Sequence, residues 1–134
     1  MAQSGLRCIV VTPEQTVLDA AAEFVALPLF DGELGVAADH APMIGRLGFG
    51  ELRIRAATQT HRYYVDGGFV QVADNLVSVL TNSAEPAQKL DEQAVRERIS
   101  ASLAATVAGD DAIQARDRAL AQSRAQLRVA QRAR

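Results

Sequence analysis

The stretch Asp31-Gly32-Glu33-Leu34-Gly35-Val36-Ala37-Ala38-Asp39-His40-Ala41-Pro42 decides how the first part of the chain folds. Turn dipeptides open and close it, and between them Leu34 and Val36 are spaced by two. This pattern indicates one short strand with a single buried face, held between surface turns. Because surface turns on a rigid scaffold often carry function, Glu33, Asp39 and His40 are candidate functional side chains.

Short apolar runs lie on both sides of this stretch, and each ends at Gly, Pro, Asp or Asn. The expected strands are 6–11, 16–18, 23–27, 34–36, 43–45, 50–56, 62–65, 69–72 and 76–80. Two boundaries depend on specific signals, because we expect Pro28 to end a strand and Asp66-Gly67-Gly68 to form a tight turn. Many short strands with such punctuation predict an antiparallel β-sandwich or barrel over residues 1–83.

The hydrophobic period changes in the last part of the chain. Residues 84–89 read as a polar linker, and 90–134 as an antiparallel hairpin of two helices, which makes the fold class α+β. We expect Asp91 to N-cap the first helix and Gly109 to follow its end. The apolar seams are thin: Val95, Ile99 and Leu103 in the first helix, and Ile113, Leu120 and Leu127 in the second. Such a hairpin is marginally stable alone and should dock on the β domain or on a partner.

Arginines cover the outer face expected for the second helix. They are Arg116, Arg118, Arg124, Arg128, Arg132 and Arg134. Arg124, Arg128 and Arg132 recur every four residues and so fall on one stripe of the helix. One interpretation is an ordinary solvated face; the other is a stripe that meets an acidic protein surface or a nucleotide phosphate.

Composition and motifs argue against several classes of protein. A net charge of −2 argues against a nucleic-acid partner, and no apolar run is long enough to enter a bilayer. Cys8 is the only cysteine, and neither histidine has metal-ligand spacing, so no metal site is expected. No phosphate loop or nucleophile elbow occurs, so we expect no catalytic residues and no cofactor.

Two rival interpretations stay open at this point. A free-standing sandwich could bind a small ligand or nucleic acid with the help of the arginine-rich helix. An enzyme would require Glu33, Asp39 and His40 to converge on a pocket, and Asp31 lies close enough in sequence to join them.

The order of short motifs resembles the epsilon subunit of the F-type ATP synthase, which is called delta in mitochondria. The motifs are Val11-Thr12-Pro13, Leu27-Pro28, Asp31–Val36, His40-Ala41-Pro42, Leu47, Gly50-Glu51-Leu52, Tyr64-Val65, Gly67-Gly68-Phe69-Val70, Asn75–Leu80, Ala84-Glu85, Leu90-Asp91 and Ala125–Val129. Each motif is weak alone, but their order and spacing are specific and run over nearly the whole chain.

The resemblance implies a non-catalytic rotor subunit at the cytoplasmic face of the bacterial plasma membrane. It implies a sandwich of about ten strands, contacts with the gamma subunit and the ring of c subunits, and a hairpin that can extend toward the alpha and beta subunits to inhibit ATP hydrolysis. The docking residues it implies are Asp31, Gly32, Glu33, Gly35, His40 and Pro42. The regulatory arm would use Asp91, Arg116, Arg124, Arg128 and Arg132.

One family motif is incomplete in this chain. Some bacterial members bind ATP in the hairpin through Ile/Leu-Asp-x-x-Arg-Ala, and the matching stretch here begins Leu90-Asp91. Ala94 takes the position of the motif's arginine, so a charge-assisted contact usually worth about 1.5–3 kcal/mol is absent. Only Asp91 of the nucleotide motif remains.

Overall fold

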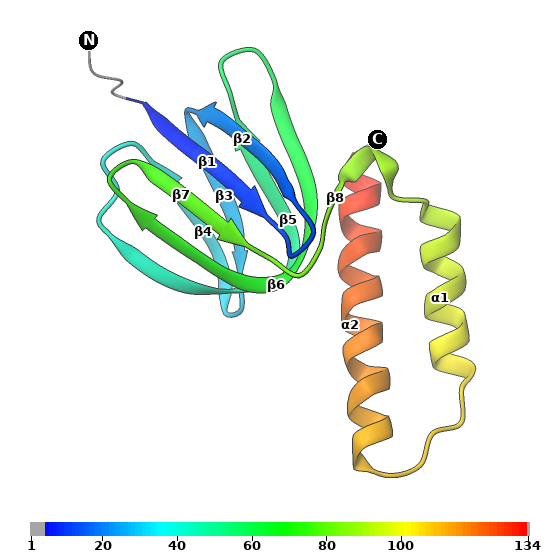
Figure 1. The fold of residues 1–134 in the computed structure, drawn as a ribbon. Coiled ribbons are helices and arrows are strands. Elements are labelled where there is room, and N and C mark those ends of the chain that lie inside the picture. The colour runs from blue at the N-terminus through cyan, green and yellow to red at the C-terminus, as the bar shows by residue number, and fades with distance from the viewer. Residues whose placement is uncertain (1–4, 134) are drawn as a thin grey trace.

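The computed structural model describes residues 5–133, which form a β-sandwich followed by two helices (Figure 1). The strands are β1 Leu6–Val11, β2 Thr16–Ala22, β3 Phe24–Leu29, β4 Gly32–Ala37, β5 Met43–Arg55, β6 Thr60–Ala73, β7 Leu76–Leu80 and β8 Ala84–Pro86. The two α-helices are α1 Glu92–Ala104 and α2 Asp110–Arg132, and a short 3-10 helix, η1 Ala87–Lys89, precedes them. The α+β class and the order of sandwich and helical hairpin are confirmed. Met1 to Ser4 and Arg134, which belong to the expected segments, lie outside the described residues.

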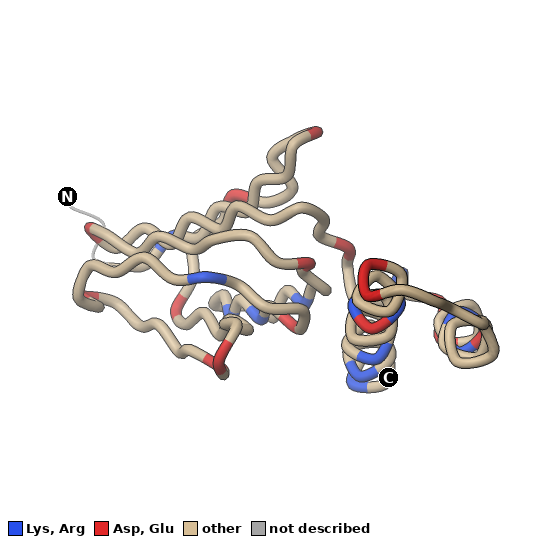
Figure 2. The backbone as a smooth tube through the Cα atoms, turned by 90° about the horizontal axis from the view of Figure 1, so that it is seen from below, with Lys and Arg blue, Asp and Glu red and all other residues tan. Residues whose placement is uncertain are grey.

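The strands form one continuous sheet in the order β2-β1-β7-β6-β5-β3-β4, with β8 paired to β6. All pairs are antiparallel except β1 with β7, which is parallel. The sheet folds over itself into two layers, and seen from below the two helices lie beside these layers (Figure 2). Fully buried side chains such as Val25, Leu27, Leu52 and Ile54 fill the space inside.

Among residues 5–133 the sandwich has eight strands, fewer than the roughly ten that the resemblance implies, because some of the separately expected strands are continuous. The expected strands 43–45 and 50–56 are both parts of β5, which has 13 residues. Likewise 62–65 and 69–72 are both parts of β6, which has 14 residues. These two long strands pair with each other over more residues than any other two strands in the sheet.

The prediction of a tight turn at Asp66-Gly67-Gly68 was wrong, because these residues lie inside β6. Gly67 and Gly68 do have positive φ, 70° and 105°, but the chain continues rather than reversing. The glycines lie where β6 changes neighbours, from β8 at residues 63–65 to β7 at residues 69–73. A Cβ on Gly68 would collide with the backbone carbonyl of Leu80, so the glycine is needed for close approach of the two strands.

The expectation that β3 ends at Pro28 was also wrong, since the strand continues to Leu29. Pro28 pairs with Glu33 of β4, whereas the pairing of β3 with β5 is interrupted between Ala26 and Leu29. The proline therefore occupies an irregularity of the ladder, one of the few places in a sheet that tolerate a missing N–H donor.

In the hairpin, Asp91 caps α1 as predicted, because its side chain accepts a hydrogen bond from the backbone N–H of Ala94 at 3.2 Å. Gly109 does not follow directly on α1, which ends at Ala104. Instead Gly109, with φ 89°, is the N-cap of α2. Asp110 and Asp111 are the first residues of α2, where their negative charges interact favourably with the positive end of the helix dipole.

The segment 84–89, expected as a linker, forms β8 and η1 in the structure. Backbone pairing of β8 with residues 63–65 of β6 fixes the point at which the chain leaves the sandwich. The division of the chain at residue 83 stays a prediction. Among residues 5–133, no helix has both the length and the apolar character required to cross a membrane.

Candidate functional site

The candidate docking residues lie at the two ends of β4. At its beginning, the Glu33 carboxylate accepts hydrogen bonds from the Arg53 guanidinium of β5 at 3.4 and 3.5 Å. This end of β4 also borders a hollow that Arg128 and Arg132 of α2 line from the other side. Glu33 therefore lies next to the hairpin.

His40 and Pro42 follow the other end of β4. Asp39, in the left-handed region at φ 64°, is tied to the β6–β7 turn because its backbone N–H donates to the Asn75 side chain at 2.6 Å. The His40 Nδ1 donates to the carbonyl oxygen of Ala41 at 2.7 Å. This loop lies on the side of the sandwich away from the helices in Figure 1.

The structure does not bring Glu33 and His40 together. Glu33 and Ala37 lie in the same extended strand, so their Cα atoms are about 13 Å apart, and His40 lies beyond Ala37. The acid–base cluster required by the enzyme interpretation does not form among the described residues. No group of three His, Cys, Asp or Glu side chains within residues 5–133 could hold a metal ion either.

The glycines of this stretch have structural roles. A Cβ on Gly35 would lie 2.6 Å from the outer end of the Phe24 ring on β3, so a larger residue at this position would displace that ring. Gly32 has φ 147° and begins β4 directly after the turn at Asp31. These positions shape the turn, whatever they contact in an assembly.

The hairpin contacts the sandwich through a small apolar cluster, which we call the junction. It consists of Tyr64 of β6, Ala87, Leu90, and Ala125, Val129 and Ala130 of α2. Phe49 of β5 packs at its margin. Burial, with the nearby charge of Asp66 as a second cause, raises the pKa of Tyr64.

Polar contacts surround the junction. The Gln122 side chain of α2 donates to the Asp66 carboxylate at 2.9 Å. Further toward the start of α2, the Arg118 guanidinium lies 5.3 Å from the centre of the Phe49 ring, in cation–π geometry. At the end of α2, Arg132 approaches Glu51 of β5 at 3.9 Å.

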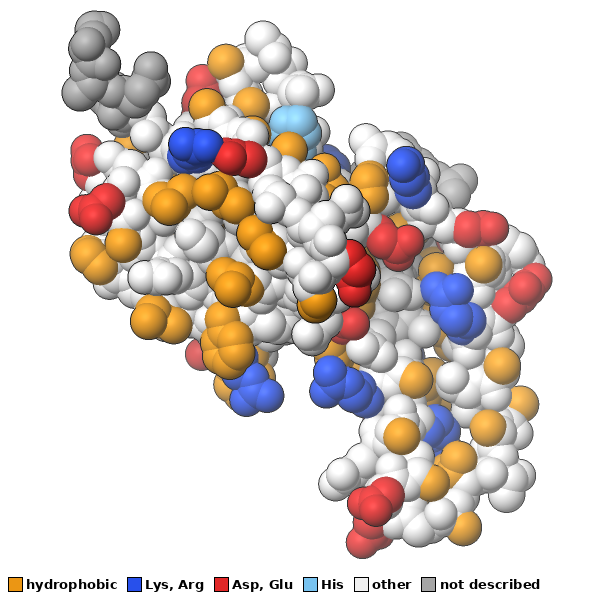
Figure 3. Space-filling model, in the orientation of Figure 1, with side chains coloured by type: hydrophobic (Ala, Val, Ile, Leu, Met, Phe, Trp, Pro, Cys, Tyr) orange, Lys and Arg blue, Asp and Glu red, His pale blue; other side chains and the backbone are white. Residues whose placement is uncertain are grey.

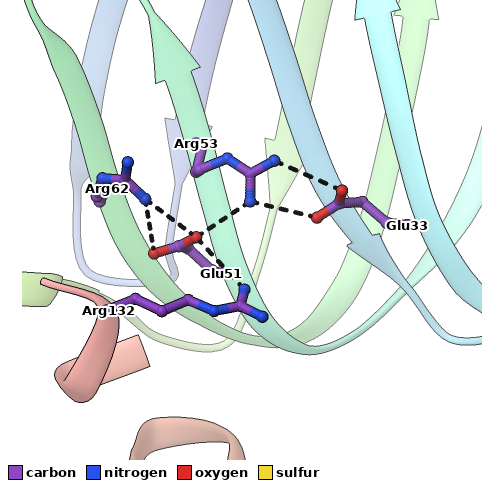
Figure 4. Close-up of polar contacts among 5 residues, drawn as sticks. All are labelled: Glu33, Glu51, Arg53, Arg62 and Arg132. Atoms are coloured by element: carbon purple, nitrogen blue, oxygen red, sulfur yellow. Dashed lines mark hydrogen bonds and ion pairs between the residues drawn. The ribbon is translucent and has the colours of Figure 1, made fainter. Parts of the chain in front are cut away.

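Glu51 is the buried charge of this region, with only 3% of its side chain exposed. Arg53 and Arg62 of the sheet reach its carboxylate at 3.2 and 3.3 Å (Figure 4). Burial of an ion is tolerated only when opposite charges compensate it, and here three guanidinium groups surround one carboxylate.

The expected regulatory arginines do not share one environment. Arg124, Arg128 and Arg132 are all exposed, but only Arg128 and Arg132 of these three also line the hollow between α2 and the sheet. The Arg116 Nη2 lies 3.5 Å from the neighbouring Asp117. In this position of the hairpin, part of the stripe faces the sandwich.

Sequence reasoning missed the residues that hold the hairpin: Phe49, Glu51, Arg62, Tyr64, Asp66 and Gln122. A signal for Glu51 was available, because strand alternation placed Glu51 and Arg53 together on the face opposite Leu52 and Ile54. Nothing in the neighbouring sequence, however, indicates that another element packs on this face.

On a second surface, large apolar side chains are exposed to solvent. Ile44, Phe69 and Leu80 are 75, 59 and 52% exposed. Ile44 pairs with Gln71, two residues from Phe69, and Phe69 pairs with Leu80, so the three share one face of the sheet. We call this the apolar face; Figure 3 shows hydrophobic side chains gathered over the sandwich.

Comparison with known proteins gives a consistent result. Residues 5–87 match the family model described as ATP synthase, delta/epsilon chain, β-sandwich domain. The ATP synthase epsilon chain of Rhodopirellula baltica is 48% identical over 125 residues, covering 93% of this chain and 98% of the relative. That of Pelotomaculum thermopropionicum is 39% identical over 107 residues, covering 78% of this chain and 80% of the relative.

Two solved structures are similar in fold. A chain of the Euglena gracilis mitochondrial ATP synthase has a TM-score of 0.83 at 19% identity, covering 91% of this chain and 79% of that one. A chain of the Tetrahymena thermophila mitochondrial ATP synthase, from its central stalk and c-ring, has a TM-score of 0.72 at 14% identity, covering 97 and 99%. At these identities the likeness shows the fold, including the combination of sandwich and hairpin.

Proposed function

Because the chain belongs to the ATP synthase delta/epsilon chain family, we propose that it is a non-catalytic rotor subunit of the F-type ATP synthase central stalk. In this role it turns with the gamma subunit and the ring of c subunits and helps couple proton-driven rotation to ATP synthesis. It belongs at the cytoplasmic face of the plasma membrane as a peripheral part of the complex. Relatives matching nearly the whole chain do not favour the alternative of a free-standing ligand- or nucleic-acid-binding module.

We assign the contact with the gamma subunit to the apolar face. Its residues Ile44, Phe69 and Leu80 expose large side chains that would otherwise be unfavourable in water. A protein partner that covers them gains the apolar burial typical of the centre of an interface.

The c-ring contact is proposed for Asp31, Gly32, Glu33, Gly35, His40 and Pro42. The structure does not support all of these residues equally. The loop after β4, to which His40 and Pro42 belong, lies away from the hairpin (Figure 1), and Pro42 lies beside the exposed Ile44, so a partner could reach this loop. Glu33 is already engaged with Arg53, so we expect its contribution to the contact to be smaller.

We further propose that the hairpin is a movable arm that inhibits ATP hydrolysis when it leaves the sandwich. The observation that carries this proposal is the small junction, in which α2 buries mainly Ala125, Val129 and Ala130 against the sheet. Released, α2 would present Arg116, Arg124, Arg128 and Arg132 to acidic surfaces of the alpha and beta subunits. Attraction between these arginines and acidic side chains of the partner subunits would favour the released position of the hairpin.

The test is to hold the hairpin on the sandwich within the assembled complex. Asp66→Cys and Gln122→Cys can be joined by a short, reducible bis-thiol linker, because the two native side chains are in contact. The other cysteine, Cys8, is buried, and burial raises the pKa of its thiol to about 12, so it should not react.

We expect the linked complex to hydrolyse ATP faster than the same complex after the linker is reduced. The two single-cysteine complexes, treated identically, are the controls. Equal hydrolysis before and after reduction, under all nucleotide conditions, would contradict the inhibitory role. The loss of proton-coupled synthesis in both states would instead indicate a defect of the sandwich.

A further inference from the structure

Glu51 differs from the other acidic residues of the sandwich in its burial and in the number of its partners. Its carboxylate is shared by Arg53 and Arg62 from the sheet and is approached by Arg132 from the last turn of α2 (Figure 4). The side chains of Arg62 and Arg132 are 38 and 61% exposed, whereas that of Glu51 is 3% exposed. The anion is therefore fixed inside, and the cations reach it from outside.

The three arginines differ in whether they have a second ion-pair partner. Arg53 has a second partner in Glu33, at 3.4 Å. Within residues 5–133, Glu51 is the one carboxylate in ion-pair contact with Arg62 and also the one in contact with Arg132. Arg128 lines the same hollow, a cavity of about 170 Å³ between α2 and the sheet. Without the Glu51 charge, Arg62 and Arg132 would lose their ion-pair partner, and Glu33 would be the one carboxylate left among the residues that line the hollow.

We propose that Glu51 is the positioning residue of the hairpin: its carboxylate neutralises the sheet arginines and thereby lets the basic end of α2 lie against the sandwich. This inference rests on the proposed function only in taking the docked hairpin as one of two positions. It assigns a role to a residue outside the stretch Asp31–Pro42 and outside the arginine stripe.

The proposal makes a prediction that a simple ion pair does not. If Glu51 and Arg132 only attracted each other, removing either side chain would loosen the hairpin to a similar degree. Because Glu51 also screens Arg132 from Arg53 and Arg62, Glu51→Gln should loosen the hairpin more than Arg132→Ala does. Removing Arg132 in the Glu51→Gln background should then restore part of the docking.

Tyr64 offers a direct readout in the full-length chain. It is buried beneath α2 in the docked position, whereas its neighbour Tyr63 packs against the interior of the sandwich. These are the only two tyrosines of the chain. The rate of nitration of Tyr64 relative to Tyr63, read by mass spectrometry of the peptide that contains both, reports release of the hairpin against opening of the sandwich.

We expect Arg132→Ala to raise the nitration ratio about two- to fivefold, the range for a partly exposed ion pair. Glu51→Gln should raise it about tenfold or more, because it removes the buried counter-charge that Arg53, Arg62 and Arg132 share and leaves these cations to repel one another. The double variant should fall between them, a non-additivity that reports the coupling of the two sites. Arg124→Ala, the same substitution on the same helix at an exposed side chain, should leave the ratio unchanged.

A ratio for Glu51→Gln equal to that of Arg132→Ala, or strictly additive effects in the double variant, would overturn the proposal. If Glu51→Gln unfolds the sandwich, both tyrosines react rapidly; the Arg132→Ala and Arg124→Ala pair then decides, and equal ratios in these two would refute it. The assay uses the isolated chain, so a changed ratio with unaltered ATP hydrolysis in the complex would leave this inference standing and count against the inhibitory arm.

Discussion

The interior of the sandwich and the junction under α2 are filled by different kinds of side chain. Inside the sandwich, Val, Leu and Ile residues from every layer are fully buried, each contributing about 1.5–3 kcal/mol. The junction has two alanines and one valine from α2 against one tyrosine, one leucine and one alanine. Alanine buries little area, so the same fold contains a strongly held platform and a weakly held arm.

This difference fits a subunit that must stay attached while one of its parts moves. Elements that move in regulation come from the less stable regions of a protein, since their release must cost only a few kcal/mol. Polar contacts at the junction, such as Gln122 with Asp66, add orientation with little additional stability. The sandwich can therefore remain docked on a partner while the hairpin changes position.

The largest difference should appear when one side chain is removed from each region. Leu52→Ala empties part of the fully buried core and should lower the free energy of unfolding of the sandwich by about 2–5 kcal/mol. Val129→Ala should instead loosen the hairpin and leave the main denaturant transition within about 0.5 kcal/mol. Urea unfolding followed by circular dichroism measures both; a main transition shifted equally by the two variants would mean that the regions are one cooperative unit.

An alkaline titration should separate the regions through Tyr64. Its pKa is raised by burial and by nearby Asp66. A raised pKa in the docked state means that docking is fully favourable below the ordinary value of about 10 and weakens as the pH rises above it. In a Tyr63→Phe background, the midpoint of the rise in tyrosinate absorbance should therefore lie above pH 10. Titration at the ordinary value would show that Tyr64 is not buried beneath α2 in solution.

The smallest of these effects concerns α1, which is tied down by its cap. Asp91→Ala removes the acceptor for the Ala94 N–H and should cost about 1 kcal/mol, confined to the first turn of α1. Hydrogen exchange of the amides at residues 92–95 measures it, with those of β5 as the internal reference. Faster exchange throughout β5 would show that the cap supports the sandwich too.

Sequence alone predicted the features that depend on near neighbours. Alternation over 50–56, the Asp91 cap and the change of period after residue 90 all follow from local rules. These rules predicted a sandwich followed by a hairpin, and the resemblance implied the same arrangement. The misread positions, Asp66-Gly67-Gly68 and Pro28, look like turns locally. Their conformations are decided by β7, β8 and β5, which lie far away in the chain.

The burial of Glu51 also could not be predicted from its neighbours in the sequence. On β5 it looks like a surface residue of an alternating strand. The arginine that approaches it belongs to the last turn of α2, and five elements, β6 to α1, lie between the two in the chain. A pairing of this kind follows from how the hairpin packs on the sheet, which local patterns do not encode.

Native-state hydrogen exchange of the full-length chain tests most directly whether the hairpin opens independently of the sandwich. The amides of α2 between Ala125 and Arg132 should exchange through a local opening that costs less free energy and depends less on denaturant than the opening of Leu52 and Ile54 in β5. A single opening free energy shared by α2 and β5, merging with global unfolding, would contradict the distinction between a stable sandwich and a releasable hairpin.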